Sequence, residues 1–264
     1  MKKLTLVLGG GACKGYAHIG VLRVLEENNI KPDLIVGTSM GAVIGGAYAC
    51  GKTSKHLIDI SKKMTKKRLM DFNIFGAIFT TGIMSGKKLR KVLEQEIGDM
   101  THENLEIPFT AISTDILKGK TVLLNKGRVV DNMLASSAIP GVYPIVNING
   151  LALCDGGVLN NVPDDIAKNI NSDNIILSID VIGEYSKQVE SSKIKVMGLT
   201  INALTLMQTE ITRLQGNNSD LRIIITQPDV AQMSFDRKSV EKSIQYGIEA
   251  MQKNMVKLKK LLID

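Results

Sequence analysis

Residues 33–42 of this chain read DLIVGTSMGA, and they predict a sharp turn between a strand and a helix. The apolar residues Leu34–Val36 stop at Gly37, and the residues from Met40 to Ala49 are small or apolar. The pattern Gly-x-Ser-x-Gly is that of a nucleophile elbow, in which glycines let backbone segments approach and Ser39 is exposed at the positive end of a helix. The same pattern also occurs in ordinary strand-to-helix turns, so other parts of the sequence must distinguish the two.

A second glycine-rich turn follows the first predicted strand, Leu4–Leu8. Residues 9–15 read GGGACKG and precede an amphipathic helical segment. The two strands and this helix form a βαβ unit, which brings both turns to one carboxyl edge of a parallel sheet. Such a loop presents backbone amides to a phosphate or to an oxyanion. A dinucleotide site needs an acidic residue where Ser39 stands, and a P-loop needs Ser or Thr after Lys14, so the oxyanion use is favoured.

The rest of the chain predicts an α/β protein with a largely parallel central sheet and helices on both faces. With 264 residues, 44% hydrophobic and 22% charged, we expect a single domain over residues 1–264. Apolar runs and helical periods predict strands at 107–114, 120–124, 142–148, 151–154, 174–181 and 221–226, and helices at 129–138, 195–215 and 236–261.

The sequence carries no sign of export or of a membrane span. No run of about eighteen apolar residues is present. The apolar stretch after Lys2 and Lys3 is too short for a signal peptide and runs directly into glycines. Three cysteines, without zinc-site or CxxC spacing, suit a reducing compartment. We therefore expect a cytoplasmic protein.

A basic surface is indicated by the formal net charge of +7. Such a surface attracts nucleic acid or anionic lipid, and the absence of Trp with only 4% aromatic residues favours lipid over nucleic acid. The basic segment Lys62–Arg68 precedes Phe72–Phe79, in which three phenylalanines share one helical face. These segments predict a peripheral contact with an anionic membrane. The alternative is that their side chains belong to the core or to an acyl pocket.

A serine nucleophile needs a base, and the three histidines are poor candidates. His18 lies inside the first helix and is expected to be packed there, His56 lies early in another helix, and His102 lies in a polar loop. Asp155 is a better candidate, because it ends an apolar strand and precedes Gly156-Gly157 at a tight turn. Burial beside the serine would raise its pKa and make it a usable base. The alternative is an ordinary Asp-Gly turn.

Three motifs in this order resemble those of the patatin-like phospholipases, which use a Ser–Asp dyad. They are GGGACKG at residues 9–15, GTSMG at 37–41 and DGG at 155–157, and flanking residues such as Ser136–Gly141 and Asn161–Pro163 extend the likeness. The resemblance covers about residues 4–180, and 181–264 are expected to complete the fold with a strand and helices. The chain is similar to the compact bacterial members of this family, and the resemblance implies a three-layer patatin-like fold.

The resemblance also implies the roles of individual residues. Ser39 is the nucleophile, Asp155 is the base, and backbone amides around Gly10, Gly11 and Ala12 form the oxyanion hole. Lys14 matches the basic position of the loop, and the surrounding turns depend on Gly15, Gly37, Gly41, Gly156 and Gly157. Many members have glycine where this chain has Ala12. We expect the hole to survive this change provided that the local φ is negative.

The predicted function is hydrolysis of lipid carboxylic esters, of the phospholipase A or lysophospholipase type, with no metal and no cofactor. A thioesterase or general carboxylesterase with the same dyad is the alternative among enzymes. A non-catalytic protein that binds a nucleotide with its glycine-rich loop is the alternative of another class. Cys13 and Cys154 each neighbour one of the predicted loops. They could form a functional thiol pair, and the alternative is that both are buried apolar side chains.

Overall fold

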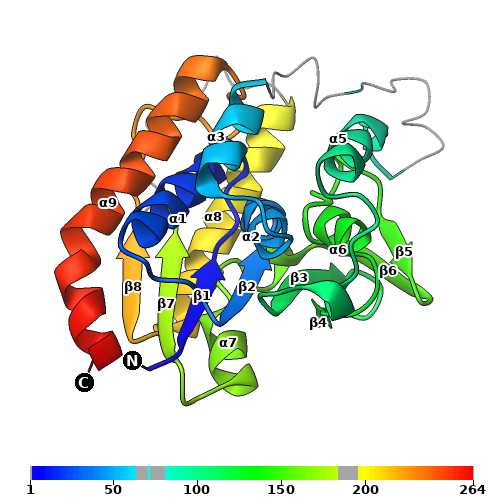
Figure 1. Cartoon of the computed structure of the whole chain (residues 1–264). Helices are drawn as coiled ribbons and strands as arrows, with labels where there is room; N and C mark the ends of the chain where they lie inside the picture. Colours follow the sequence, from blue (N-terminus) through cyan, green and yellow to red (C-terminus); the bar gives the residue numbers. More distant parts are fainter. Residues whose placement is uncertain (1, 64–70, 72–80, 184–195, 264) are drawn as a thin grey trace.

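A computed structural model describes residues 2–63, 71, 81–183 and 196–263. Within these residues, eight strands form one sheet with helices on both faces (Figure 1). The strands are β1 (Leu4–Leu8), β2 (Leu34–Thr38), β3 (Phe109–Asp115), β4 (Lys120–Leu124), β5 (Val146–Ile148), β6 (Leu151–Asp155), β7 (Ile175–Asp180) and β8 (Leu221–Ile224). The helices are α1 (Ala17–Glu27), α2 (Met40–Ala49), α3 (Ser54–Lys63), α5 (Lys87–Ile97), α6 (Val129–Ser136), α7 (Asp164–Ile170), α8 (Val196–Gln215) and α9 (Arg237–Ile263), with short 3₁₀ segments η1 (Ala12–Tyr16), η3 (His102–Asn104) and η4 (Gly156–Val158).

The sheet has the strand order β5-β6-β3-β2-β1-β7-β8, and β4 also pairs with β3. The five strands from β3 to β8 along this path are parallel, which confirms the predicted largely parallel sheet. Strands β4 and β6 run antiparallel to β3, and β5 runs antiparallel to β6. Strands β3 and β4 therefore form a hairpin, and β5 and β6 form another around the turn Asn149-Gly150, whose two residues have φ of 51° and 78°.

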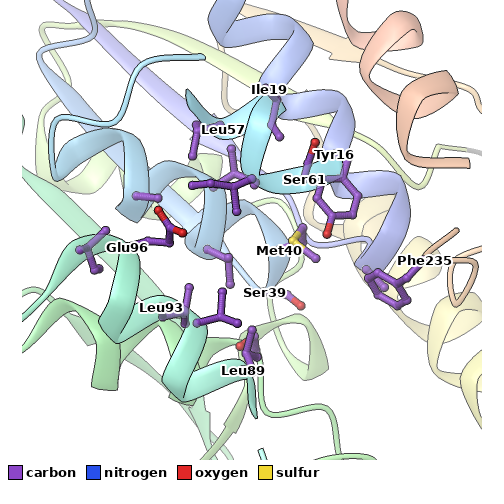
Figure 2. A pocket seen from close by; sticks show the side chains of 18 of the residues that line it. Tyr16, Ile19, Ser39, Met40, Leu57, Ser61, Leu89, Leu93, Glu96 and Phe235 are labelled. Atoms are coloured by element: carbon purple, nitrogen blue, oxygen red, sulfur yellow. The ribbon is translucent and has the colours of Figure 1, made fainter. Parts of the chain in front are cut away.

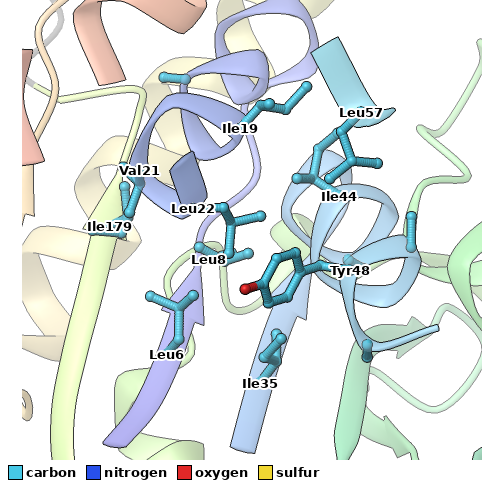
Figure 3. Packing of buried hydrophobic residues seen from close by; sticks show 14 of the residues in the cluster. Leu6, Leu8, Ile19, Val21, Leu22, Ile35, Ile44, Tyr48, Leu57 and Ile179 are labelled. Carbon is cyan, nitrogen blue, oxygen red and sulfur yellow. The ribbon is translucent and has the colours of Figure 1, made fainter. Parts of the chain in front are cut away.

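The alternation of side chains along β1 explains the two layers of helices. Leu6 and Leu8 point to one face, where they pack with α1 and α2 (Figure 3). Val7 points to the other face, into a smaller core to which α7 contributes Ile166. Helix α9 covers the first face beside α1, whereas α8 lies on the opposite side of the sheet (Figure 1). Helices on both faces are thus confirmed.

The C-terminal helix packs against α1 at two glycines. A Cβ atom at Gly247 would lie 1.9 Å from the carbonyl oxygen of Ala17, and one at Gly20 would lie 2.1 Å from that of Ile244. The backbones of α1 and α9 can approach this closely only because neither position carries a side chain. Helix α9 is in this way fixed against α1 near the start of the chain.

Two findings concern the membrane. No described helix is both long and apolar enough to cross a bilayer. The predicted membrane patch lies almost wholly outside the described residues, since only Lys62 and Lys63 of Lys62–Arg68, and none of Phe72–Phe79, belong to them.

Candidate active site

Ser39 lies at the tip of a strained turn between β2 and α2. Its φ of 54° and ψ of −123° are unusual for a residue with a side chain and cost on the order of 1–3 kcal/mol. A Cβ atom at Gly41 would lie 2.1 Å from the carbonyl oxygen of Leu8, and one at Gly37 would lie 2.7 Å from that of Gly41. Both glycines of the pattern are therefore required by close backbone contacts, as expected of an elbow.

A serine on α6 anchors this turn from outside the motif. The backbone N–H of Ser39 donates to Oγ of Ser136 at 3.0 Å, and that hydroxyl donates to the carbonyl oxygen of Ile112 at 2.5 Å. The strained residue is thus tied to β3 through one buried hydroxyl group. The sequence offered no signal for this contact beyond the position of Ser136 in a stretch that resembles the family.

The register of β3 explains why Asp155 lies next to Ser39. Residues 109–112 of β3 pair with β2, and residues 113–115 pair with β6, while β4 occupies the other edge of β3. Strand β6 therefore continues the sheet where β2 ends. Because Asp155 pairs with Ser113, one residue beyond the Thr38–Ile112 pair, its side chain emerges beside the elbow.

The environment of Asp155 raises its pKa. The residue is only 2% exposed, and burial moves the pKa from an ordinary 3.8 to about 6. Hydrogen bonds from the Ser39 side chain and from the N–H of Gly157, the latter at 2.8 Å, oppose this shift without cancelling it. A Cβ atom at Gly156 would lie 2.2 Å from the Ile112 carbonyl oxygen, so the turn after Asp155 needs glycine. A carboxylate with this pKa is a competent base near neutral pH.

The glycine-rich loop offers fewer free amides than predicted. The N–H of Gly10 donates to the carbonyl oxygen of Asn161 at 3.1 Å and is therefore already engaged. The amides of Gly11 and Ala12 have no hydrogen-bond acceptor among the described residues, and both residues line the same small cavity as Ser39 and Asp155. The available donors are thus at Gly11 and Ala12.

The condition set for Ala12 is not met. Its φ is 47°, in the left-handed region, so the conditional expectation for the oxyanion hole does not apply as it was stated. A side chain in this region costs roughly 1 kcal/mol, so the backbone conformation at this position favours glycine. Ala12 still lines the cavities on both sides of Ser39.

Two buried side chains hold the loop by its carbonyl groups. Nε2 of His18 donates to the carbonyl oxygen of Gly9 at 2.7 Å, and complete burial lowers the pKa of His18 to about 4, so the ring is neutral. The side-chain amide of Asn161 donates to the carbonyl oxygen of Gly10 at 3.4 Å. His18 is therefore packed, as predicted, but it also supports the loop, which the sequence did not indicate.

The C-terminal part of the chain supports the same loop. The N–H of Cys13 donates to the backbone carbonyl of Gln232, and its thiol donates to that of Ser234, each at 2.8 Å. The carbonyl oxygen of Lys14 accepts from the side chains of Gln227 and Ser243, each at 2.9 Å. Contacts from residues beyond 180 thus complete a loop that belongs to the N-terminal motif.

Other predicted residues lie farther from the serine or act differently. The Lys14 side chain does not line either cavity at Ser39, and Gly15 lets Met40 approach, since a Cβ there would lie 2.4 Å from Met40 Cγ. Cys13 and Cys154 are buried, and neither forms a disulfide bond. His56 contacts Glu96 at 3.0 Å, and His102 contacts the carbonyl oxygen of Phe109.

No group of three His, Cys, Asp or Glu side chains suited to a metal ion occurs among the described residues.

Two cavities meet at Ser39. The larger, of about 120 Å³, has nearly all-apolar walls from α2, α3 and α5, with Glu96 on the side away from Ser39 (Figure 2). The smaller, of about 40 Å³, contains Asp155. The residues that line both cavities are Ala12, Ser39, Ile139 and Met233.

Comparison with known proteins links the chain to one family. A family model described as patatin-like phospholipase matches residues 6–168. An uncharacterized NTE family protein of Mycobacterium tuberculosis is 37% identical over 173 residues, which are 65% of this chain and 47% of that protein. The human patatin-like phospholipase domain-containing protein 6 is 32% identical over 186 residues, which are 67% of this chain and 13% of that protein. The chain thus spans about half, or much less, of the length of these relatives.

Solved structures give a weaker likeness. VipD from Legionella pneumophila matches 94% of this chain and 67% of its own, with 15% identity and a TM-score of 0.48. The type III effector ExoU matches all of this chain and 54% of its own, with 13% identity and a TM-score of 0.48.

Proposed function

Because this chain belongs to the patatin-like phospholipase family, we propose that it is a serine hydrolase of lipid carboxylic esters with Ser39 as nucleophile and Asp155 as base. One observation carries the proposal: a buried carboxylate with a pKa near 6 accepts a hydrogen bond from a strained serine that opens onto an apolar cavity. Serine needs an adjacent base to react, and the apolar cavity suits an acyl chain.

The reaction follows from these positions. Asp155 accepts the proton of the Ser39 hydroxyl while Oγ attacks the ester carbon, and the amides of Gly11 and Ala12 stabilise the resulting oxyanion. The oxyanion collapses, the ester C–O bond breaks, and Asp155 returns the proton to the leaving alkoxide. Water then attacks the acyl-serine and gives a proton to Asp155. The second collapse releases the carboxylic acid and returns this proton to the Ser39 oxygen.

The two cavities suggest the orientation of the substrate. A general acid must reach the oxygen of the leaving alcohol. Asp155 lines the 40 Å³ cavity and not the 120 Å³ cavity, so the alcohol belongs in the former and the acyl chain in the latter. This orientation also argues against a nucleotide in the glycine-rich loop, because its phosphates would face the Asp155 carboxylate.

A panel of substrates with one acyl chain separates the enzyme classes. We expect octanoate oxygen esters to be hydrolysed faster than the thioester octanoyl-CoA. The reason is that coenzyme A, the leaving group of the thioester, is too large for the smaller cavity. Ser39→Ala should abolish every activity. Faster turnover of the thioester would support the thioesterase alternative. Tight binding of a fluorescent nucleotide, unchanged in Ser39→Ala and without esterase activity, would support the non-catalytic one.

A lipid substrate and a basic chain also favour contact with an anionic membrane surface. The segments that would make it, Lys62–Arg68 and Phe72–Phe79, are proposed for this role from their sequence alone. Sedimentation with anionic vesicles should fall by at least severalfold when the three phenylalanines are replaced by serine. Neutral vesicles serve as the control, and equal sedimentation of the variant would contradict the role.

A further inference from the structure

The walls of the smaller cavity carry polar side chains that the larger cavity lacks. Thr205, Gln208 and Gln232 surround Asp155 there. Thr205 and Gln208 belong to α8, and Gln232 belongs to the segment between β8 and α9. All three lie outside residues 6–168, so the match to the family model assigns them no role.

Gln208 lies directly over the turn that follows Asp155. A Cβ atom built at Gly157 would lie 2.5 Å from Nε2 of Gln208 and 3.1 Å from Oδ1 of Asp155. Within the described part of the chain, the terminal amide of Gln208 has no hydrogen-bond partner. One donor group and one acceptor are therefore available beside the carboxylate that would protonate a leaving alcohol.

Gln232 contributes a second polar group that is fixed in place. Oγ1 of Thr205 lies 2.7 Å from the carbonyl oxygen of Ile201 and 2.7 Å from the terminal amide of Gln232. A hydroxyl has one proton and cannot donate to both, so we assign the amide nitrogen of Gln232 to face Thr205, which then donates to Ile201. This arrangement leaves the Gln232 side-chain oxygen free to accept a hydrogen bond.

The charge of the cavity limits what it can hold. Asp155 is the one ionisable side chain among the described residues that line it. A phosphate placed there would lie beside a carboxylate with no lining cation to compensate, which is unfavourable. A neutral hydroxyl group, in contrast, both donates and accepts and can bond with either amide side chain.

We propose that this cavity binds the leaving alcohol and selects a small uncharged alcohol with several hydroxyl groups, the class of which glycerol is the simplest member. Gln208 and Gln232 hydrogen-bond the hydroxyl groups that do not react. This inference rests on the proposed function, because it takes Asp155 as the group that protonates the leaving oxygen.

The test compares three octanoate esters as dissolved monomers: 1-octanoylglycerol, ethyl octanoate and 1-octanoyl-lysophosphatidylcholine. We expect kcat/KM of the wild-type protein to be at least tenfold higher for the glyceryl ester than for the other two. Gln208→Leu should lower kcat/KM for the glyceryl ester about three- to tenfold, as expected for one lost hydrogen bond, and change that for ethyl octanoate less than twofold. Gln245→Leu, on the exposed surface of α9, is the matched control and should change neither.

The outcomes separate this inference from the function on which it rests. Equal rates for the glyceryl and ethyl esters, a faster lysophospholipid, or an equal loss of both activities in Gln208→Leu would overturn the alcohol preference and leave the hydrolase intact. Hydrolysis of none of the three esters would instead contradict the proposed function. Circular dichroism of Gln208→Leu checks that α8 and the rest of the fold are retained.

Discussion

The raised pKa of Asp155 links activity to stability. The folded protein holds this carboxyl group with a pKa near 6, whereas the unfolded chain has the ordinary value near 3.8. Between about pH 3.8 and pH 6, the folded state binds more protons at this group than the unfolded state does. The contribution of Asp155 to stability therefore falls as the pH rises through this range. The proposed base must be ionised to accept a proton, so we expect activity in the pH range where burial of the charged carboxylate is unfavourable.

Replacing Asp155 with asparagine should therefore stabilise the protein at high pH. At pH 8 the free energy of unfolding should rise by up to roughly 3 kcal/mol relative to wild type, and at pH 5 the difference should be smaller. Urea denaturation at both values measures it. In wild type, kcat/KM should rise with pH and level off above about pH 6. A variant no more stable than wild type at pH 8 would contradict the burial argument.

The left-handed Ala12 should be a source of strain that glycine relieves. We expect Ala12→Gly to raise the free energy of unfolding by up to about 1 kcal/mol, with the lost strain partly offset by a more flexible unfolded chain. Activity should stay within about twofold, since glycine keeps the N–H. Ala12→Val, which adds a β-branched side chain at positive φ, is the opposing variant and should destabilise. Destabilisation by Ala12→Gly would contradict the assigned backbone conformation.

Among the elements, α2 sets the length of the larger cavity. Residues Met40 and Ala47 both line it and are seven residues apart, so the cavity follows the helix for about 10 Å. An extended alkyl chain advances about 1.25 Å per carbon for C–C bonds near 1.5 Å, so about eight carbons fit along α2. Each buried methylene contributes about 0.8 kcal/mol, or roughly fourfold in kcat/KM, until the cavity is filled.

Ala47→Phe should shorten the preferred chain. The substrates are p-nitrophenyl esters with acyl chains of four to twelve carbons. Wild-type kcat/KM should rise with chain length up to about eight carbons and then level off. In the variant kcat/KM should level off at a shorter chain, and its value for the four-carbon ester should be unchanged. Ala203→Phe, at an exposed position on α8, is the matched control. The same profile in wild type and Ala47→Phe would show that the acyl chain does not lie along α2.

The sequence was sufficient for the elements whose patterns are local. The elbow at Ser39, the glycine loop and the Asp155 turn were predicted because glycine spacing reports tight turns directly. The roles of His18, Asn161 and Ser136 were missed, because each depends on a contact that only the folded chain creates. The predicted strand at 142–148 is shorter, beginning at Val146, since Pro144 cannot donate to a strand ladder.

In the molecule as a whole, the two ends of the chain cooperate at one site. Helix α9 packs on α1, and its Ser243 bonds the carbonyl group of Lys14, so the last helix supports the first loop. The N–H of Lys2 likewise donates to the carbonyl oxygen of Leu262 at 2.9 Å. The motifs proposed to be catalytic, all within the first 168 residues, thus contact residues that the family model does not cover.

Gly247→Ala tests this dependence. Its Cβ would lie 1.9 Å from a backbone oxygen of α1, and we expect a loss of about 3 kcal/mol in the free energy of unfolding as the helices separate. Lys253→Ala, on the exposed face of α9, should change stability by less than about 0.5 kcal/mol. Thermal unfolding of both variants measures the effect. Wild-type stability in Gly247→Ala would mean that α9 does not pack against α1 as described.

The central claim is that Asp155 activates Ser39, and covalent labelling with a fluorophosphonate probe tests it most directly. Peptide mass spectrometry would locate the label in wild type, Ser39→Ala, Asp155→Asn and, as a control, Asp131→Asn on α6. The account predicts label on the Ser39 peptide of wild type and of the control, none in Ser39→Ala, and labelling slowed by at least about a hundredfold in Asp155→Asn. Labelling of Asp155→Asn at the wild-type rate would contradict the dyad.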